Sequence, residues 1–371
     1  MPTSADLDAK MMSRALSEAR FGRPSPNPNV GAVLAKGDQV IAVGHHERAG
    51  AEHAEVLALR AAGDKAAGAT LYVTLEPCNH QGRTAPCTDA IIKAGLARVV
   101  VGCRDPNPNV DGGGIERLQQ AGIEVVLGVR NAEARALIEP WVKHVTTGLP
   151  FIMIKMAISL DGRIATRTRA SKWITGPEAR AKVHELRAAS DAVMVGIGTV
   201  LADDPQLTVR DVDGPNPVRV FVDSNLRVSA GAKAVVTASE VPTWILTTPE
   251  APEPAERALT ALGAEVIRVA RSNEGRVDIQ SALRVLAQRG IVTLMIEGGA
   301  ELTGSVLAAR LADELHVFIG PLLLGPRGRP GAVDWAGPED PTDAPRIVDP
   351  KWELCGKDAY VHGVLAYSPS R

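Results

Sequence analysis

Four residues constrain this 371-residue chain more than any other feature: His53 and Glu55, two positions apart, then Cys78 directly after Pro77, and Cys87 nine positions later. Zinc prefers imidazole and thiolate ligands in tetrahedral geometry, and a catalytic zinc site uses three protein ligands and leaves one position for water. Such a water loses a proton near neutral pH. The pattern therefore predicts a water-activating metal site in which His53, Cys78 and Cys87 are ligands and Glu55 is the general acid and base.

Two other interpretations use the same residues. Both cysteines could be buried structural side chains, because free cysteine often behaves as a small hydrophobic residue. The three ligands could instead hold a purely structural zinc. Structural zinc sites are closed by four protein ligands, whereas this pattern offers three and adds a carboxylate, so we favour the catalytic interpretation.

Length and composition exclude several classes of protein. A chain of 371 residues is too long for one ordinary core and predicts two domains. The formal net charge of −2 offers no basic surface for nucleic acid, so we expect no nucleic-acid partner. Of the four cysteines, only Cys103 and Cys355 lie outside the metal pattern. The cysteines therefore do not form a disulfide framework, and thiolate ligands indicate a reducing compartment. With no apolar leader and no stretch long enough to span a membrane, we expect a cytoplasmic protein without membrane contact.

The first part of the chain alternates helical and extended patterns. Apolar residues at helical spacing predict a helix over 6–21, and a hairpin follows with strands at 30–34 and 39–44. His53 and Glu55 open the next helix. Buried strands are expected at 69–75, 98–102 and 123–127, with Cys87 near a helix N-terminus, which favours thiolate. This alternation predicts a three-layer α/β domain over residues 1–147.

A second domain is expected over residues 148–371, beginning with a strand at 151–157. The pattern then predicts a helix from Pro177 to Arg187 and a loop over 196–210. It also predicts strands near 191–196, 217–224, 241–247 and 293–297. Gly298 and Gly299 lie between a strand and a helix. Such a turn lets backbone N–H groups approach a phosphate, but it is also an ordinary connection.

The spacing of the metal pattern carries a resemblance. Its H-x-E…P-C…C order resembles zinc-dependent nucleobase deaminases. The insertion EPCNHQGRTAPC between the cysteines is similar to one family, the bifunctional riboflavin-biosynthesis deaminase–reductases. Further segments match that family over most of the chain, namely 25–31, 155–165, 171–175, 196–210 and 293–305. The resemblance implies an N-terminal three-layer cytidine-deaminase-like α/β domain and a C-terminal dihydrofolate-reductase-like α/β domain.

The resemblance also implies two activities on phosphoribosylaminopyrimidine substrates. One is zinc-dependent hydrolytic deamination of 2,5-diamino-6-(5-phosphoribosylamino)pyrimidin-4(3H)-one. The other is NADPH-dependent reduction of the ribosyl group of 5-amino-6-(5-phosphoribosylamino)uracil to ribityl. It implies homo-oligomers formed through the reductase domain. The alternative that we keep is a zinc deaminase of another base with a non-catalytic second domain.

Site residues follow from the resemblance position by position. In the deaminase domain, Asn27, His80 and Arg83 would bind the substrate, with Arg83 on its phosphate. In the reductase domain the expected substrate residues are Ser171, Arg187, Leu207, Arg210 and Glu297. The expected NADPH residues are Ala157, Trp173, Thr199, Asp203, Ser224, Gly299, Ala300, Glu301, Leu302, Thr303, Gly304 and Ser305. For Arg187 and Arg210 a solvated surface charge is the alternative.

Overall fold

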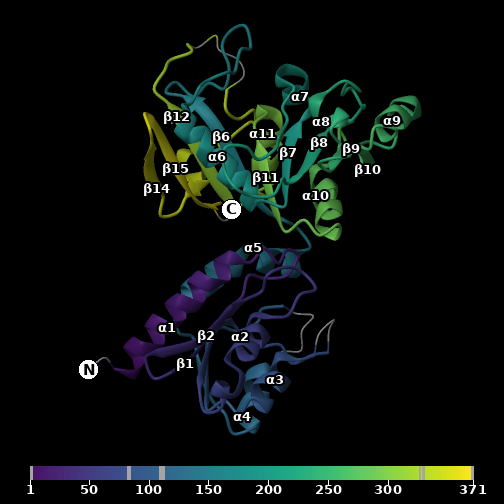
Figure 1. The fold of residues 1–371 in the computed structure, drawn as a ribbon. Helices are drawn as coiled ribbons and strands as arrows, with labels where there is room; N and C mark the ends of the chain where they lie inside the picture. Colours follow the sequence, from purple (N-terminus) through teal and green to yellow (C-terminus); the bar gives the residue numbers. More distant parts are fainter. Residues whose placement is uncertain (1–2, 82–84, 108–112, 326, 328–330, 369–371) are drawn as a thin grey trace. The chain divides into compact units, whose positions relative to one another are not determined.

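The computed structural model describes residues 3–81, 85–107, 113–325, 327 and 331–368. The chain divides into two compact units, Met1–Leu149 and Pro150–Arg371, and each is described by itself (Figure 1). The boundary expected from sequence, after residue 147, lies two residues before this division.

The described part of the first unit is built on a mixed sheet in the order β2-β1-β3-β4-β5. β1 pairs antiparallel with β2 and β3, while β3, β4 and β5 are parallel. The central strands are buried on both faces, as their continuous apolar runs predict. The strands are β1 (Gly31–Lys36), β2 (Gln39–His45), β3 (Thr70–Leu75), β4 (Arg98–Cys103) and β5 (Glu124–Leu127).

Helices cover both faces of this sheet and complete the expected three layers. One layer holds α1 (Ser4–Glu18) and α5 (Asn131–Thr147), which contact each other and the sheet. The other holds α2 (Ala54–Ala62), α3 (Cys87–Lys93) and α4 (Gly114–Gln120), which follow one another across the opposite face. Short 3₁₀ turns at Ala19–Phe21 and Gly63–Ala66 extend α1 and α2.

The described part of the second unit is built on a larger sheet in the order β10-β9-β8-β7-β11-β6-β12-β15-β13, with β14 also paired to β15. The strands from β10 to β12 are parallel to one another, and β15 adds to β12 in the antiparallel sense. The strands are β6 (Phe151–Ser159), β7 (Ala192–Gly196), β8 (Val218–Val222), β9 (Thr243–Thr247), β10 (Glu265–Arg268), β11 (Thr293–Glu297), β12 (Glu314–Gly320), β13 (Arg346–Ile347), β14 (Lys351–Cys355) and β15 (Asp358–Ala366).

One expectation for the second unit was wrong. The segment 196–210, expected as a loop, begins with a helix, α7, because Ile197 and Val200 lie one turn apart and both enter the core. The helices of the unit are α6 (Pro177–Ala189), α7 (Ile197–Asp203), α8 (Lys233–Val236), α9 (Glu253–Thr260), α10 (Ile279–Gln288) and α11 (Ala300–Ala308), with a 3₁₀ turn at Pro341–Asp343.

The parallel strands bring distant segments to one edge of the sheet. β8, β7, β11 and β6 are consecutive neighbours, so their carboxyl ends lie side by side. Ligands of open α/β sheets bind at this edge. The residues that follow or end these strands include Ser224, Thr199, Gly299 and Ala157, which were expected at one cofactor site.

Candidate functional sites

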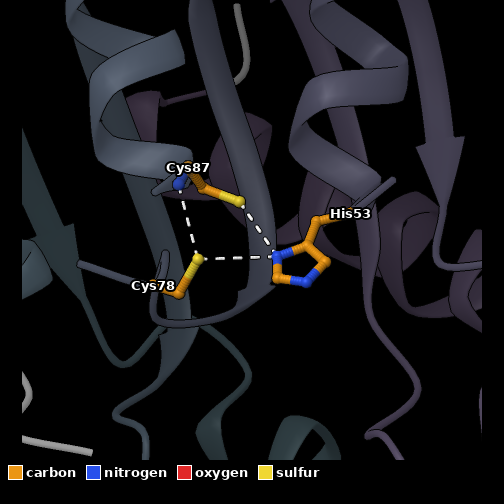
Figure 2. A group of neighbouring side chains, drawn as sticks. All are labelled: His53, Cys78 and Cys87. Atoms are coloured by element: carbon orange, nitrogen blue, oxygen red, sulfur yellow. Dashed lines mark hydrogen bonds between the residues drawn. The ribbon is translucent and has the colours of Figure 1, made fainter. Parts of the chain in front are cut away.

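Three elements of the first unit bring the predicted metal ligands together (Figure 2). His53 is the N-cap residue of α2, Cys78 lies in the loop after β3, and Cys87 is the first residue of α3. The sulfur of Cys87 lies 3.1 Å and that of Cys78 lies 3.5 Å from Nδ1 of His53. The three ligand atoms all lie within 4.8 Å of one another.

Close backbone packing fixes the two sides of this cluster. A Cβ atom on Gly44 of β2 would lie 2.3 Å from the carbonyl oxygen of Ala54, so glycine lets the start of α2 press against the strand. A Cβ atom on Gly114, which begins α4, would lie 2.1 Å from the carbonyl oxygen of Pro77. Both contacts are next to a ligand, because His53 precedes Ala54 and Cys78 follows Pro77.

Two residues that the sequence did not single out hold the loop of Cys78. The buried carboxylate of Glu76 accepts backbone N–H groups from Asp105 and Ile115, each at 3.2 Å. Asn79 accepts hydrogen bonds from the hydroxyl of Thr88 at 3.0 Å and from Arg117 at 2.9 Å. The only sequence signal for either residue was its place inside the EPCN segment.

The electrostatics suit a soft dication. The contact with the Cys87 thiol, together with that of His53, lowers the pKa of Cys78 to about 4. The contact between the two sulfurs raises the pKa of Cys87. The contact between His53 and Cys78 raises the pKa of His53. A neutral imidazole and two thiolates are the form that binds zinc, and a bound dication would favour it by stabilising the second thiolate. The donor set therefore fits zinc.

Glu55 lies in the first turn of α2 and is 3% exposed. Burial raises the pKa of its carboxyl group, which is the shift expected for a group that must both take and give a proton. Its carboxyl also contacts the Cys87 thiol. Among the described residues it is not part of the ligand cluster.

The expected substrate residues of this unit differ in their placement. Asn27 lies near the cluster, because its Nδ2 is 3.0 Å from Nε2 of His46 and the His46 ring is edge-on to His53 at a centroid distance of 5.2 Å. Burial lowers the pKa of His46, a residue that the sequence did not single out. His80 follows Asn79 and is exposed. Arg83 lies outside the described residues.

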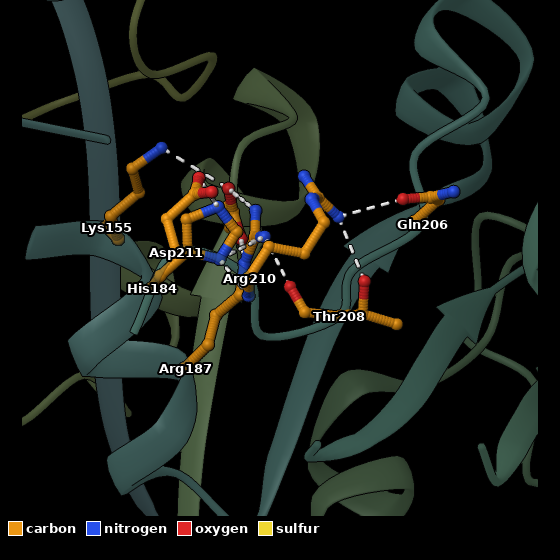
Figure 3. A network of polar contacts seen from close by, with 8 residues as sticks. Lys155, His184, Arg187, Gln206, Thr208, Arg210 and Asp211 are labelled. Carbon is orange, nitrogen blue, oxygen red and sulfur yellow. Dashed lines mark hydrogen bonds and ion pairs between the residues drawn. The ribbon is translucent and has the colours of Figure 1, made fainter. Parts of the chain in front are cut away.

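In the second unit, Arg187, which is labelled in Figure 3, forms a buried pair with Glu297. Nε and Nη2 of Arg187 donate to the two carboxylate oxygens at 2.8 and 2.7 Å, and Nη1 donates to the carbonyl oxygen of Thr208 at 3.0 Å. Lys155 adds a longer contact to Glu297 at 3.4 Å. Burial alone would raise the pKa of Glu297, but the charges of Arg187 and Lys155 outweigh it and hold that pKa below its usual value. The solvated alternative does not hold for Arg187.

Arg210 differs from Arg187 in its partners. It is exposed, and Nη1 donates to the neutral oxygens of Gln206 at 3.0 Å and Thr208 at 2.9 Å (Figure 3). In the part of the chain that the structure describes, no carboxylate forms an ion pair with it. Leu207, three residues before Arg210, is buried and has a backbone φ of 54°. This guanidinium is therefore available to an anionic ligand.

Four other expected residues of the second unit lie on β6 or in the segments that follow β6 and β8. The hydroxyl of Ser171 donates to Asp203 at 2.7 Å. Trp173 is 67% exposed, with the guanidinium of Arg180 4.4 Å from its ring centroid. Ser224 accepts the backbone N–H of Val277 at 3.0 Å. Ala157 is half-buried on β6.

The segment 299–305 begins at Gly299, the N-cap of α11, and continues into that helix. Gly299 has a φ of 87°, and a Cβ atom there would lie 3.3 Å from the hydroxyl oxygen of Thr199, so the two expected cofactor residues are adjacent. Further along, the side of the helix at Gly304 is covered, because a Cβ atom there would lie 1.9 Å from the carbonyl oxygen of Asp334. Ala300, Leu302 and Thr303 are buried, whereas Ser305 is exposed and the exposed Glu301 pairs with Arg276 at 2.8 Å.

Comparisons with known families agree with both halves. The family described as cytidine and deoxycytidylate deaminase zinc-binding region matches residues 5–103, and the RibD C-terminal domain matches residues 150–361. The riboflavin biosynthesis protein RibD of Escherichia coli (strain K12) is 43% identical over 97% of this chain and 100% of its own length. That of Aquifex aeolicus is 46% identical over 86% of this chain and 88% of its own length.

Two solved structures are similar over almost the whole chain. Acinetobacter baumannii RibD, form 2, has a TM-score of 0.87 at 36% identity and covers 98% of this chain and 100% of its own. A Thermotoga maritima protein has a TM-score of 0.86 at 37% identity and covers 99% of this chain and 100% of its own. The latter is described as a diaminohydroxyphosphoribosylaminopyrimidine deaminase/5-amino-6-(5-phosphoribosylamino)uracil reductase.

A His–Cys–Cys cluster beside a buried glutamate, on a three-layer α/β unit, defines a zinc-binding deaminase domain, and here it is joined to a reductase domain. The chain belongs to the RibD family, the bifunctional deaminase–reductases of riboflavin biosynthesis. The family and the two-domain fold class expected from the sequence are thereby confirmed. Among the helices in the described residues, none combines the length and apolar character needed to cross a membrane.

Proposed function

We propose that the first unit hydrolyses the amino group of 2,5-diamino-6-(5-phosphoribosylamino)pyrimidin-4(3H)-one to a carbonyl, releasing ammonia. The observation that carries this proposal is the cluster of His53, Cys78 and Cys87 beside the buried Glu55. His53, Cys78 and Cys87 would hold zinc, which would supply an activated water. The carboxylate of Glu55 would take up a proton and give a proton to the departing ammonia, a role that its raised pKa supports.

The remaining expected residues of this unit would bind the substrate. Asn27 would hydrogen-bond the pyrimidine ring, and its place beside His46 and the ligand His53 supports this role. His80 would contact the ring, and Arg83 would bind the phosphate.

The second unit would then reduce 5-amino-6-(5-phosphoribosylamino)uracil with NADPH. The ribosylamine would open to an imine; bound NADPH would supply a hydride for the imine carbon, with a proton added at the nitrogen, giving the ribityl group. Cofactors carry hydride chemistry, and the protein orients the reactants. The carboxyl edge of β8, β7, β11 and β6 supports the assignment of the expected cofactor residues, because Thr199, Ser224 and Gly299 lie along it.

Two differently placed arginines would serve the substrate site of the second unit. Arg210, whose guanidinium contacts only neutral oxygens among the described residues, would bind the phosphate. Glu297, which accepts two hydrogen bonds from Arg187, would contact the substrate from the end of β11. Ser171 and Leu207 would line the same site. Homo-oligomers through this unit and a cytoplasmic location complete the proposal.

One assay separates this function from a deaminase of another base with an inert second unit. The full chain is incubated with the diaminopyrimidinone ribotide, with and without NADPH, and the products are identified from their masses by mass spectrometry. We expect the deaminated ribosylamino compound without NADPH and the ribitylamino compound with it. No change in mass in either case contradicts the proposal, and deamination without reduction supports the alternative.

A further inference from the structure

Arg210 lies in a short loop, residues 207–211, whose two end residues both have left-handed backbone conformations. Leu207 has a φ of 54° and Asp211 a φ of 65°. Residues other than glycine seldom adopt this conformation, and it persists only where the surrounding structure holds it. The position of Arg210 therefore depends on the groups that hold this loop.

Two residues of α6 hold the loop from one face of that helix. His184 and Arg187 are three positions apart, so their side chains lie next to each other on α6. Nδ1 of His184 accepts the backbone N–H of Arg210 at 3.1 Å, and Nη1 of Arg187 donates to the carbonyl oxygen of Thr208 at 3.0 Å (Figure 3). His184 is 6% exposed and Arg187 is 8% exposed. The loop backbone is thus fixed to a helix at two buried points.

The surroundings of His184 define which ring nitrogen carries hydrogen. Two N–H donors face Nδ1, namely the backbone of Arg210 at 3.1 Å and Nη1 of Arg187 at 3.5 Å, so Nδ1 is an acceptor. The hydrogen of the neutral ring is then on Nε2, which lies 4.0 Å from a carboxylate oxygen of Asp211. A protonated ring would place another N–H against both donors and lose the contact with Arg210.

The environment of His184 favours the neutral ring. Burial lowers the pKa of His184, and the neighbouring charges of Arg187 and Arg210 lower it further. The carboxylates of Asp211 in the loop and of Glu297 at the end of β11 oppose this shift with smaller effects. The ring is therefore neutral at pH 7 and takes up a proton only as the pH falls below 6.5, the ordinary pKa of histidine.

The side chain of Arg210 follows the backbone of its loop. Nη1 donates to Oε1 of Gln206 and to Oγ1 of Thr208, which belong to the same segment (Figure 3). A displacement of this backbone would therefore move the guanidinium as well. The hydrogen bond from Arg210 to His184 is placed to prevent that displacement.

We propose that His184 is a positioning residue of the reductase site, which holds the backbone of Arg210 so that the guanidinium is presented to the phosphate of the substrate. Protonation of His184 would release this hold. The inference rests on the proposed binding of the phosphate by Arg210, and it gives α6 a role in substrate affinity without contact between His184 and the substrate.

Steady-state reduction of the supplied ribosylamino intermediate by the full chain, at saturating NADPH, tests the proposal. We expect His184→Leu to raise KM by about 5- to 30-fold with little change in kcat, because a buried N–H loses its acceptor. His184→Gln should restore most of this loss, because Oε1 of glutamine can accept the same N–H. Equal losses in the two variants would overturn the proposal.

Two comparisons show whether His184 acts through Arg210. In an Arg210→Ala chain, His184→Leu should raise KM no further, because both changes remove the same contact. With the dephosphorylated compound, His184→Leu and the wild type should differ little. Losses that multiply, or an equal loss with the dephosphorylated compound, would show that His184 only supports the fold, and the proposal would be wrong. His362→Leu, at a histidine of β15 paired with Glu353 at 3.3 Å, is the matched control and should leave KM unchanged.

The pH profile provides a test on the wild-type chain. Its KM should rise as the pH falls below 6.5, because Nδ1 of His184 becomes protonated. The substrate phosphate also titrates, near about pH 6, and the His184→Gln chain measures that part alone. Parallel profiles of the wild type and His184→Gln would contradict the proposal.

Nitrogen-15 NMR of the histidine-labelled chain needs no activity. The signals that disappear in His184→Gln assign the ring, and we expect a neutral ring with its hydrogen on Nε2 at pH 7. A hydrogen on Nδ1 would overturn the proposal, because that nitrogen could not accept the N–H of Arg210. If the wild-type chain fails to reduce the intermediate, the proposed reduction fails, while this spectrum still decides whether His184 holds Arg210.

Discussion

Arg187 grips Glu297 with two parallel hydrogen bonds, Nε to Oε2 at 2.8 Å and Nη2 to Oε1 at 2.7 Å, although 110 residues separate them in the chain. The third nitrogen of Arg187 binds the carbonyl oxygen of Thr208. Because all three nitrogens are used inside the protein, Arg187 is better suited to hold Glu297 and the 207–210 loop than to bind a phosphate directly. Arg210 is the arginine left for an anion.

Arg187→Ala should destabilise the second unit by about 3–5 kcal/mol at neutral pH, because it leaves a buried carboxylate without its main partner. Urea unfolding of the full chain followed by tryptophan fluorescence measures this, since four of the five tryptophans lie after residue 150. Arg257→Ala, which breaks an exposed pair with Glu253 on α9, is the control and should cost less than about 1 kcal/mol. Equal effects of the two changes would contradict the buried-pair interpretation.

The pH dependence of that difference has a definite sign. In the folded wild type the pKa of Glu297 lies below its ordinary value of 4.5, so this group stabilises the fold above about pH 4.5 and loses that contribution as the pH falls toward its folded pKa. Without Arg187, burial favours the protonated carboxyl. The free-energy gap between wild type and Arg187→Ala should therefore shrink on acidification from about pH 7 to about pH 4. A gap that widens would show that another group governs it.

Glu76→Gln should weaken zinc binding by about 10- to 100-fold, as changes in groups that orient metal ligands typically do. The glutamine amide keeps one acceptor oxygen and places an NH₂ group against the N–H of Asp105 or Ile115. Competition with a chromogenic chelator measures the affinity. Glu116→Gln, at a half-buried carboxylate paired with Arg104, is the control and should bind zinc as the wild type does.

Glu55→Gln should keep zinc and lose about 10²–10⁴-fold in the rate of deamination, because the proton shuttle is removed and the ligands remain. Cys87→Ala should lose both zinc and activity. Metal analysis beside the rate assay separates the two variants. A zinc-free Glu55→Gln protein would mean that Glu55 is structural.

Arg210→Ala should weaken the reductase for the phosphorylated intermediate by about 10- to 100-fold, as expected for the loss of a charge-assisted hydrogen bond. Deamination should continue unchanged. The comparison is with the dephosphorylated compound, for which the variant and the wild type should differ little. Arg289→Ala, which removes an exposed arginine paired with Glu265, controls for the change in charge.

Two defective chains should complement each other. Glu55→Gln leaves the reductase intact, and Gly299→Asp leaves the deaminase intact but puts a side chain on a residue with a φ of 87° at the expected cofactor site. Mixed together, they should convert the diaminopyrimidinone ribotide to the ribitylamino product through a released intermediate. If each half-reaction works alone but the mixture does not, the intermediate is passed within one molecule.

The metal chemistry and the fold class could be predicted from the sequence because both depend on local patterns. Ligand type and spacing identified His53, Cys78 and Cys87, and alternating apolar runs identified most strands. The pattern failed at α7, where Ile197 and Val200 span a single turn, too short to distinguish a helix from a loop.

Only the tertiary structure decided which polar groups meet. Arg187 and Glu297 lie 110 residues apart, and Asn27 and His46 lie 19 apart on different segments. The local sequence around one residue of such a pair does not predict the other residue. These contacts form only where segments that are distant in the chain pack side by side. The sequence by itself predicted the three residues that the structure brings together as candidate zinc ligands, proposed Glu55 as the acid–base residue, and determined the two-domain class. The folded chain determined that Arg187 is an interior partner, that Glu76 supports the zinc loop and that His46 faces Asn27, since hydrogen bonding between buried groups depends on where the backbone places them.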